Sequence, residues 1–255
     1  MTVTVLPPAR AGRGSCPGTR LTPGRVALVT NGTRGLGEAI CRELAGDGAH
    51  VVAGHWHDDE GAEKFLASMT ADFPRQAVAV YDGDVSDPDG CRRAVQEVVG
   101  QFGQLDILAS SPWPGDTPGP VLPADSGPPV TAGLDVACLL AEAAFEHMLA
   151  RGTGRIITVC PEAGAHPATG TVGADGADAT VSLTDLTRTL SQQAIAGLRP
   201  AAPPEADIGL TVNVVTPVDP PGSPAGTEEI VQAVGFLAGD QASFITGQIW
   251  AADAR

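Results

Sequence analysis

Residues 26–37 read VALVTNGTRGLG, and this short stretch decides the fold. The four apolar residues at its start are typical of a buried strand, and the glycines that follow predict a tight turn. Beyond the turn, Leu36, Ile40 and Leu44 repeat at helical spacing. In a strand–turn–helix unit, the backbone amides at the start of the helix can bind a phosphate. The stretch therefore predicts the phosphate-binding turn of an α/β nucleotide-binding domain.

Outward from this turn, strand and helix patterns alternate along the chain. Strand patterns cover 50–53, 77–80, 106–109, 155–159, 211–215 and 248–250, and helical patterns cover 59–71, 87–102, 133–151, 178–198 and 227–238. Repeated strand–helix units predict a doubly wound, Rossmann-type parallel sheet of about seven strands with helices on both faces. No linker of domain size interrupts the alternation, so we expect one domain over 24–255.

Two segments depart from the alternation. Residues 1–23 hold prolines, glycines and three arginines with little apolar periodicity, which predicts a flexible N-terminal tail. Such an arginine-rich segment without acidic residues also fits a transit peptide, although it shows no amphipathic helix pattern. Residues 112–130 carry seven prolines, which predicts a stiff, extended loop at the carboxyl end of the fourth strand. Ligands bind at that end of the strands in this architecture.

Composition excludes several classes of protein. The formal net charge of −15 and the pI near 4.5 oppose binding to nucleic acid, which needs a basic surface. No run of about 18 apolar residues predicts a membrane span, and no apolar segment near the N-terminus predicts a secretory signal, so we expect a cytoplasmic protein. The five cysteines are scattered without a C-x-x-C pair, which predicts free thiols and no metal site.

The order of these segments resembles the short-chain dehydrogenase/reductase family, especially its ketoacyl-carrier-protein reductases. The resemblance covers residues 25–252. It is carried by TNGTRGLG at 30–37, Asp84-Val85, GQLDIL at 103–108, GRIITV at 154–159, GLTVNVVTP at 209–217 and EEIVQAVGFLAGDQASFITGQ at 228–248. The resemblance implies that a dinucleotide contacts the turn with its phosphates, Asp84 and Val85 with its adenine end, and the end of the fourth strand at Ser110. The implied turn contacts are Asn31, Gly32, Thr33, Arg34, Gly35, Leu36 and Gly37.

The residues after the second strand bear on the choice of dinucleotide. A site that prefers NAD has an acidic residue there to bind the ribose 2′-hydroxyl. This chain has Gly54, His55, Trp56 and His57, and its first acidic residue is Asp58. Arg34 in the turn, with His55 and His57 nearby, would tolerate a 2′-phosphate better, which predicts NADP over NAD. Either histidine equally fits an exposed loop residue. The sequence leaves open whether any cofactor binds.

Where the dinucleotide would extend toward its nicotinamide end, the chain departs from the family pattern. Ser110-Ser111-Pro112-Trp113 replaces the family's asparagine–asparagine–alanine–glycine stretch, and a proline followed by an indole would narrow the crevice. Asn31 replaces the first glycine of the turn, a mild change because asparagine tolerates positive φ. Residues 218–227 are shorter than the family's substrate-covering lid.

The family's active site uses an asparagine, a serine, a tyrosine and a lysine, and the tyrosine transfers the proton. Alignment places Ala137, Pro161, Gly176 and Thr180 at these positions. The chain has one tyrosine, Tyr81, and one lysine, Lys64, so no tyrosine-x-x-x-lysine motif exists. We therefore predict no catalytic residue of the family's kind.

Three functions remain open. The first is a non-catalytic or regulatory subunit that assembles with itself or with an active relative through the helices at 133–151 and 178–198. The second is an atypical NADP-dependent ketoreductase. The third is a redirected non-redox enzyme of secondary metabolism, such as a cyclase, lyase or isomerase, with a small-molecule ligand. Cys160 and His166 also fit a nucleophile–base pair, although a cysteine at a strand end is more often a packing residue.

Overall fold

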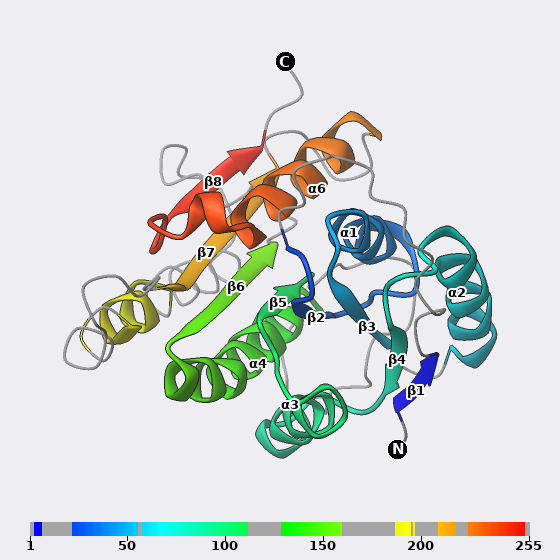
Figure 1. The fold of residues 1–255 in the computed structure, drawn as a ribbon. Helices are drawn as coiled ribbons and strands as arrows, with labels where there is room; N and C mark the ends of the chain where they lie inside the picture. The colour runs from blue at the N-terminus through cyan, green and yellow to red at the C-terminus, as the bar shows by residue number, and fades with distance from the viewer. Residues whose placement is uncertain are drawn as a thin grey trace.

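The computed structural model describes residues 3–6, 22–55, 58–111, 129–159, 187–194, 196, 209–217 and 224–252. Their eight strands form one sheet in the order β1-β4-β3-β2-β5-β6-β7-β8 (Figure 1). Strands β2 to β8 run parallel, and β1 is antiparallel to β4. The strands are β1 Val3–Leu6, β2 Val26–Val29, β3 His50–His55, β4 Val78–Asp82, β5 Ile107–Ser110, β6 Thr153–Val159, β7 Gly209–Pro217 and β8 Ile249–Ala252. The predicted doubly wound fold is confirmed.

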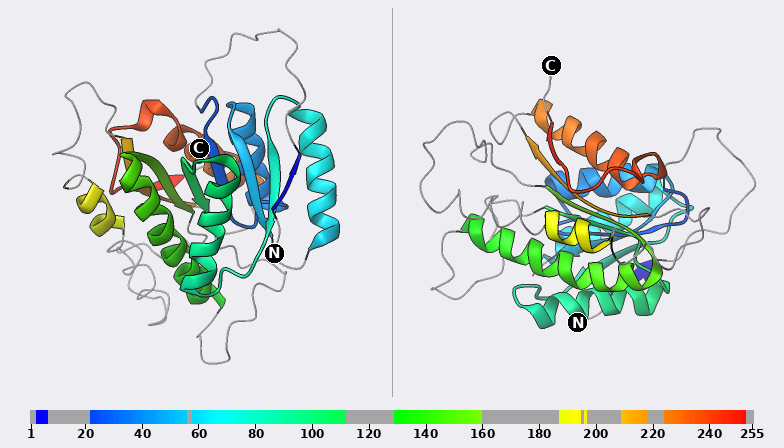
Figure 2. Two further views of the ribbon diagram at one scale, coloured as in Figure 1. Left: turned by 60° about the horizontal axis from the view of Figure 1, so that its bottom comes forward. Right: turned by 90° about the vertical axis from the view of Figure 1, so that its left-hand side faces the viewer.

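Helices cover both faces of the sheet (Figure 2). The helices α1, α2 and α6 pack on one face, and α3 and α4 pack on the other together with a helical segment at 187–194. The helices are α1 Gly35–Gly46, α2 Asp59–Asp72, α3 Pro88–Phe102, α4 Pro129–Arg151 and α6 Pro224–Ala238. This layering is the one that strands buried on both sides require.

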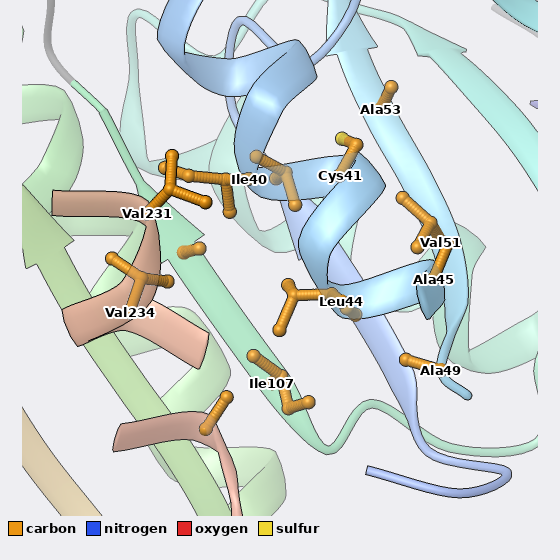
Figure 3. Packing of buried hydrophobic residues seen from close by; sticks show 14 of the residues in the cluster. Ile40, Cys41, Leu44, Ala45, Ala49, Val51, Ala53, Ile107, Val231 and Val234 are labelled. Carbon is orange, nitrogen blue, oxygen red and sulfur yellow. The ribbon is translucent and has the colours of Figure 1, made fainter. Parts of the chain in front are cut away.

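The apolar positions of α1 hold that helix against the sheet. Ile40 and Leu44 are almost completely buried between Ile107 of the sheet and the α6 residues Val231 and Val234 (Figure 3). Truncating a buried leucine to alanine costs about 2–5 kcal/mol, so this contact fixes the helix firmly. The N-terminus of α1 is thereby held at the carboxyl edge of the sheet, where the candidate site lies.

The predicted flexible tail is wrong for Val3–Leu6, which form a strand paired with β4 in the register Val3 to Tyr81 through Leu6 to Val78. Without this strand, β4 would be a sheet edge with exposed backbone donors and acceptors. The end of the predicted tail is also ordered, since Thr22 is buried and its hydroxyl donates to Leu44 O over 3.4 Å. Residues 7–21 lie outside the described residues.

The proline-rich loop predicted over 112–130 ends earlier than expected, because α4 begins at Pro129. Proline suits the first turn of a helix, where its missing N–H would have had no partner. Residues 112–128, including Trp113, lie outside the described residues. The helix predicted over 178–198 is described only at 187–194 and 196.

Candidate functional site

The turn between β2 and α1 requires the residues that occupy it. Asn31 has a φ of 50° and Gly35 a φ of 52°, both in the left-handed region. A methyl group built on Gly32 would lie 2.8 Å from Ala53 Cβ, and one on Gly37 would lie 2.2 Å from Asn31 O. The turn is thus packed directly against β3 and against itself. Gly32 and Gly37 are needed because a side chain at either position would clash with its neighbours.

The start of α1 lacks a side-chain cap. Its N-cap residue is Arg34, whose side chain accepts no hydrogen bond, and the first helical bond runs from Glu38 N to Arg34 O over 3.1 Å. By contrast, α2 and α3 are capped by the carboxylates of Asp58 and Asp87. The space beside Gly35 is open, since a methyl group built on this residue would meet no atom within 4 Å. Among these three helices, α1 is the one whose first-turn amides remain for an external anion.

Two polar side chains at the carboxyl ends of β3 and β5, the strands on either side of β2, are buried. They are Ser110, which is 1% exposed, and His55, which is 8% exposed. Within the described part of the chain, neither Ser110 Oγ nor His55 Nδ1 has a hydrogen-bond partner. Buried polar atoms are normally satisfied, so both fit a bound ligand or water at this edge. His57 lies outside the described residues.

The loop after β4 holds Asp84 and Val85, the residues expected at the adenine end. Asp84 Oδ1 accepts from Ser86 N over 2.8 Å, and the Cys91 thiol contacts Val85 O at 3.2 Å. Both residues are half-buried, and they follow a strand that lies beside β3 in the sheet. The predicted cofactor residues therefore lie along one edge, in the strand order β4, β3, β2 and β5.

The turn carries a charge pair that sequence reasoning missed. Arg34 Nη1 lies 3.3 Å from Asp58 Oδ2. The other oxygen, Asp58 Oδ1, accepts from Gly61 N over 3.1 Å at the start of α2. The sequence signal was the D-x-x-G pattern, which recurs at Asp87–Gly90 and marks a capping aspartate in both helices. Its contact with Arg34 joins residues 24 positions apart and had no local signal.

The only tyrosine and the only lysine of the chain lie on opposite faces of the sheet. Tyr81 is 2% exposed in the core beneath α3, and burial raises its pKa to about 12. Lys64 is exposed on α2 and pairs with Glu60 over 2.6 Å. Ala137, aligned with the family's asparagine, is buried in α4. The remaining aligned positions and the candidate pair are Pro161, Gly176, Thr180, Cys160 and His166, all outside the described residues.

Cys41 and Cys91 are free thiols, and burial raises the pKa of each. Among the described residues, no group of three or more histidine, cysteine or acidic side chains could hold a metal ion. None of the helices in the described part of the chain is long and apolar enough to cross a bilayer.

Comparisons with known proteins agree with the geometry. Residues 25–112 match the family model described as short chain dehydrogenase. The cis-4-hydroxycyclohexanecarboxylate dehydrogenase of Sinomonas cyclohexanicum is 32% identical over 242 residues, which cover 90% of this chain and 95% of that protein. The chain belongs to the short-chain dehydrogenase/reductase family. This confirms the resemblance drawn from the motifs and places the chain in a family of oxidoreductases.

Two further proteins are similar to this chain over most of its length. The 3-oxoacyl-[acyl-carrier-protein] reductase FabG of Escherichia coli is 28% identical over 88% of this chain and 94% of its own length. The solved structure of YwfH, an NADPH dependent reductase involved in bacilysin biosynthesis, is 25% identical with a TM-score of 0.68. It covers 91% of this chain and 99% of its own.

Proposed function

We propose that this chain is an NADP(H)-binding family member that lacks the tyrosine–lysine proton transfer and acts as a non-catalytic or regulatory subunit. One observation carries the proposal. The phosphate-binding turn keeps the conformation and close packing that its glycines require, while Tyr81 is buried in the core and Lys64 is exposed on a helix of the other face.

The support for nucleotide binding comes from the edge of the sheet. The uncapped first turn of α1 offers amides and the positive end of the helix dipole to a pyrophosphate. The unpartnered Ser110 Oγ and His55 Nδ1 lie at the ends of β5 and β3, where ribose hydroxyls of a dinucleotide could satisfy them. Arg34 supplies the positive charge that a 2′-phosphate requires, which favours NADP over NAD.

Ordinary turnover in this family requires a proton transfer as well as a hydride transfer. The dinucleotide, when bound, would supply the hydride for reduction of a carbonyl, and the developing alkoxide must then receive a proton. The phenol of Tyr81 is buried among apolar side chains of the core, where burial raises its pKa to about 12. The resemblance of the sequence motifs supports the proposal, because it predicts alanine, proline, glycine and threonine at the positions of the family's active-site groups.

The second candidate is an atypical NADP-dependent reductase in which water or the substrate supplies the proton. It is favoured by the identity of 32% to a dehydrogenase across 90% of the chain. The non-redox alternative depends on residues 112–128, which lie outside the described residues, and stays a prediction.

Titration of the purified chain with NADPH tests the proposal, followed by an assay for NADPH consumption with 3-oxoacyl-carrier protein. We expect saturable binding without turnover. The variant Gly37→Ala should abolish binding, because its methyl group would collide with Asn31 O. Gly100→Ala on α3 is the matched control, since its methyl group meets nothing within 4 Å. Turnover would favour the atypical reductase, and absence of binding to the unmodified chain would refute nucleotide binding.

Assembly is part of the same proposal. On α4, Leu140 and Met148 belong to the core, whereas Val136 and Leu139 are only half-buried and leave apolar surface for a partner. Leu190 on the neighbouring helical segment is also core. We expect native mass spectrometry of the purified chain to show a homo-oligomer. A strictly monomeric protein would leave only assembly with a different family member.

A further inference from the structure

We propose that Asp58 is an internal counter-ion of Arg34 that competes with the 2′-phosphate of a dinucleotide and so weakens the chain's preference for NADP(H) over NAD(H). This inference rests on the proposed nucleotide binding. It concerns Asp58, which stands beyond the end of β3 and caps α2.

The two groups are placed to be reached by a ligand. Arg34 stands at the N-cap of α1, inside the phosphate-binding turn, and its Nη1 lies 3.3 Å from Asp58 Oδ2. The side chains are 40% and 29% exposed, so neither is sealed in the protein. An exchange of partners on Arg34 therefore needs no opening of the core.

Asp58 is the fixed member of the pair. Its Oδ1 accepts from Gly61 N over 3.1 Å and caps α2. A methyl group built on Gly61 would lie 2.3 Å from Asp58 Oδ2, so the carboxylate sits directly against the backbone of the first helical turn. The long Arg34 side chain can move, but the aspartate cannot leave without uncapping α2. A phosphate that binds Arg34 must therefore share it with this carboxylate.

The charges around the pair oppose a second anion. Asp59 and Glu60 follow Asp58 in the first turn of α2. Glu60 forms an ion pair with Lys64 over 2.6 Å. The charge of Arg34 is thus already neutralised by Asp58 before a ligand arrives. The Asp58 carboxylate and a phosphate bound to the same arginine would repel each other. The neutral 2′-hydroxyl of NAD(H) meets no such repulsion. Asp58 consequently lowers the affinity for NADP(H) more than the affinity for NAD(H).

A pair of nucleotide fragments isolates the effect. Adenosine 2′,5′-bisphosphate and 5′-AMP differ only in the 2′-phosphate and carry no nicotinamide, so they report on this corner of the site alone. Calorimetry at low ionic strength, about 0.01 M, keeps electrostatic interactions effective over about 30 Å. The quantity measured is the ratio of the two dissociation constants, 5′-AMP over the bisphosphate.

Asp58→Asn removes the charge and keeps the cap, because asparagine caps helices as well as aspartate. We expect this variant to raise the ratio about tenfold, a difference of about 1.4 kcal/mol. Asp87→Asn is the matched control, because it removes the same charge from the equivalent cap of α3, which binds Gly90 N over 2.6 Å. Its ratio should stay at the wild-type value. In the Arg34→Gln background, Asp58→Asn should have no effect on the ratio.

Three outcomes would overturn the inference. An unchanged ratio in Asp58→Asn means that the carboxylate does not compete. A weaker affinity for both fragments means that Asp58 binds the ribose instead. An equal rise in Asp87→Asn means that only overall charge matters. If neither fragment binds the unmodified chain, the proposed nucleotide binding itself fails, which is a distinct result.

Discussion

The side-chain amide of Asn31 donates to the backbone carbonyl of Ser111 over 2.9 Å and fastens the turn after β2 to the end of β5. Asn31 is the one described residue other than glycine with a positive φ. The hydrogen bond gives a physical reason for an asparagine where the family pattern has a glycine. It links two positions that are 80 residues apart.

Two substitutions at Asn31 should therefore differ in stability. Asn31→Gly loses the hydrogen bond but tolerates the backbone conformation, at a cost of about 1 kcal/mol. Asn31→Ala also strains the backbone, which adds about 1–2 kcal/mol. Urea denaturation of both variants measures the difference. Equal stability of the two would show that the positive φ is not retained.

The effect of a glycine-to-alanine substitution on stability should depend on the space around the glycine. Gly32→Ala places a methyl group 2.8 Å from Ala53 Cβ, and we expect a loss of about 1–3 kcal/mol. Gly100→Ala in α3 should instead stabilise by about 0.4–1 kcal/mol, because its site is open and helical. Thermal melts of the two variants check the signs. A Gly32→Ala variant as stable as the unmodified chain would contradict the packing described for the turn.

His50 should make stability depend on pH. Burial lowers its pKa below the ordinary value, and neutral Nδ1 accepts from Ala77 N over 2.9 Å. The unfolded chain therefore binds this proton more readily, so the stabilisation is complete above the unfolded pKa of about 6.5 and is lost as the pH falls through the folded pKa. Urea midpoints of the unmodified chain and of His50→Asn should diverge at high pH and converge at low pH. A constant difference at all pH values would contradict this.

Substitution of Arg155 should destabilise the fold far more than substitution of its exposed partner, Asp240. Arg155 is 1% exposed, and its guanidinium donates to three backbone carbonyls, those of Gly154, Gly209 and Gly239. Arg155→Met would leave them without that donor, and we expect a loss of about 3–5 kcal/mol by analogy with broken buried pairs. Asp240 lies 3.8 Å from this side chain and is 64% exposed. The substitution Asp240→Asn should therefore lower the free energy of unfolding by less than about 1 kcal/mol. Chemical denaturation distinguishes the two, and similar losses would contradict the burial argument.

Local pattern predicted most of the regular structure. The apolar run at Val26–Val29 and the helical repeat of Ile40 and Leu44 are properties of neighbouring residues, and both elements form as expected. The strand Val3–Leu6 was missed because four residues carry almost no periodic signal and the strand forms only against the edge of β4. The start of α4 at Pro129 was missed because proline reads as a breaker everywhere except in the first helical turn.

The sequence alone determined the doubly wound fold, the position of the phosphate-binding turn and the lack of a tyrosine–lysine pair, since each depends on residue type and local spacing. Tertiary structure decided which groups meet at the edge of the sheet. It buried Ser110 and His55 without partners, brought Asp58 to Arg34 and joined Asn31 to Ser111. Side chains far apart in the chain meet only when parallel strands bring their carboxyl ends to one edge, and no local pattern records that contact.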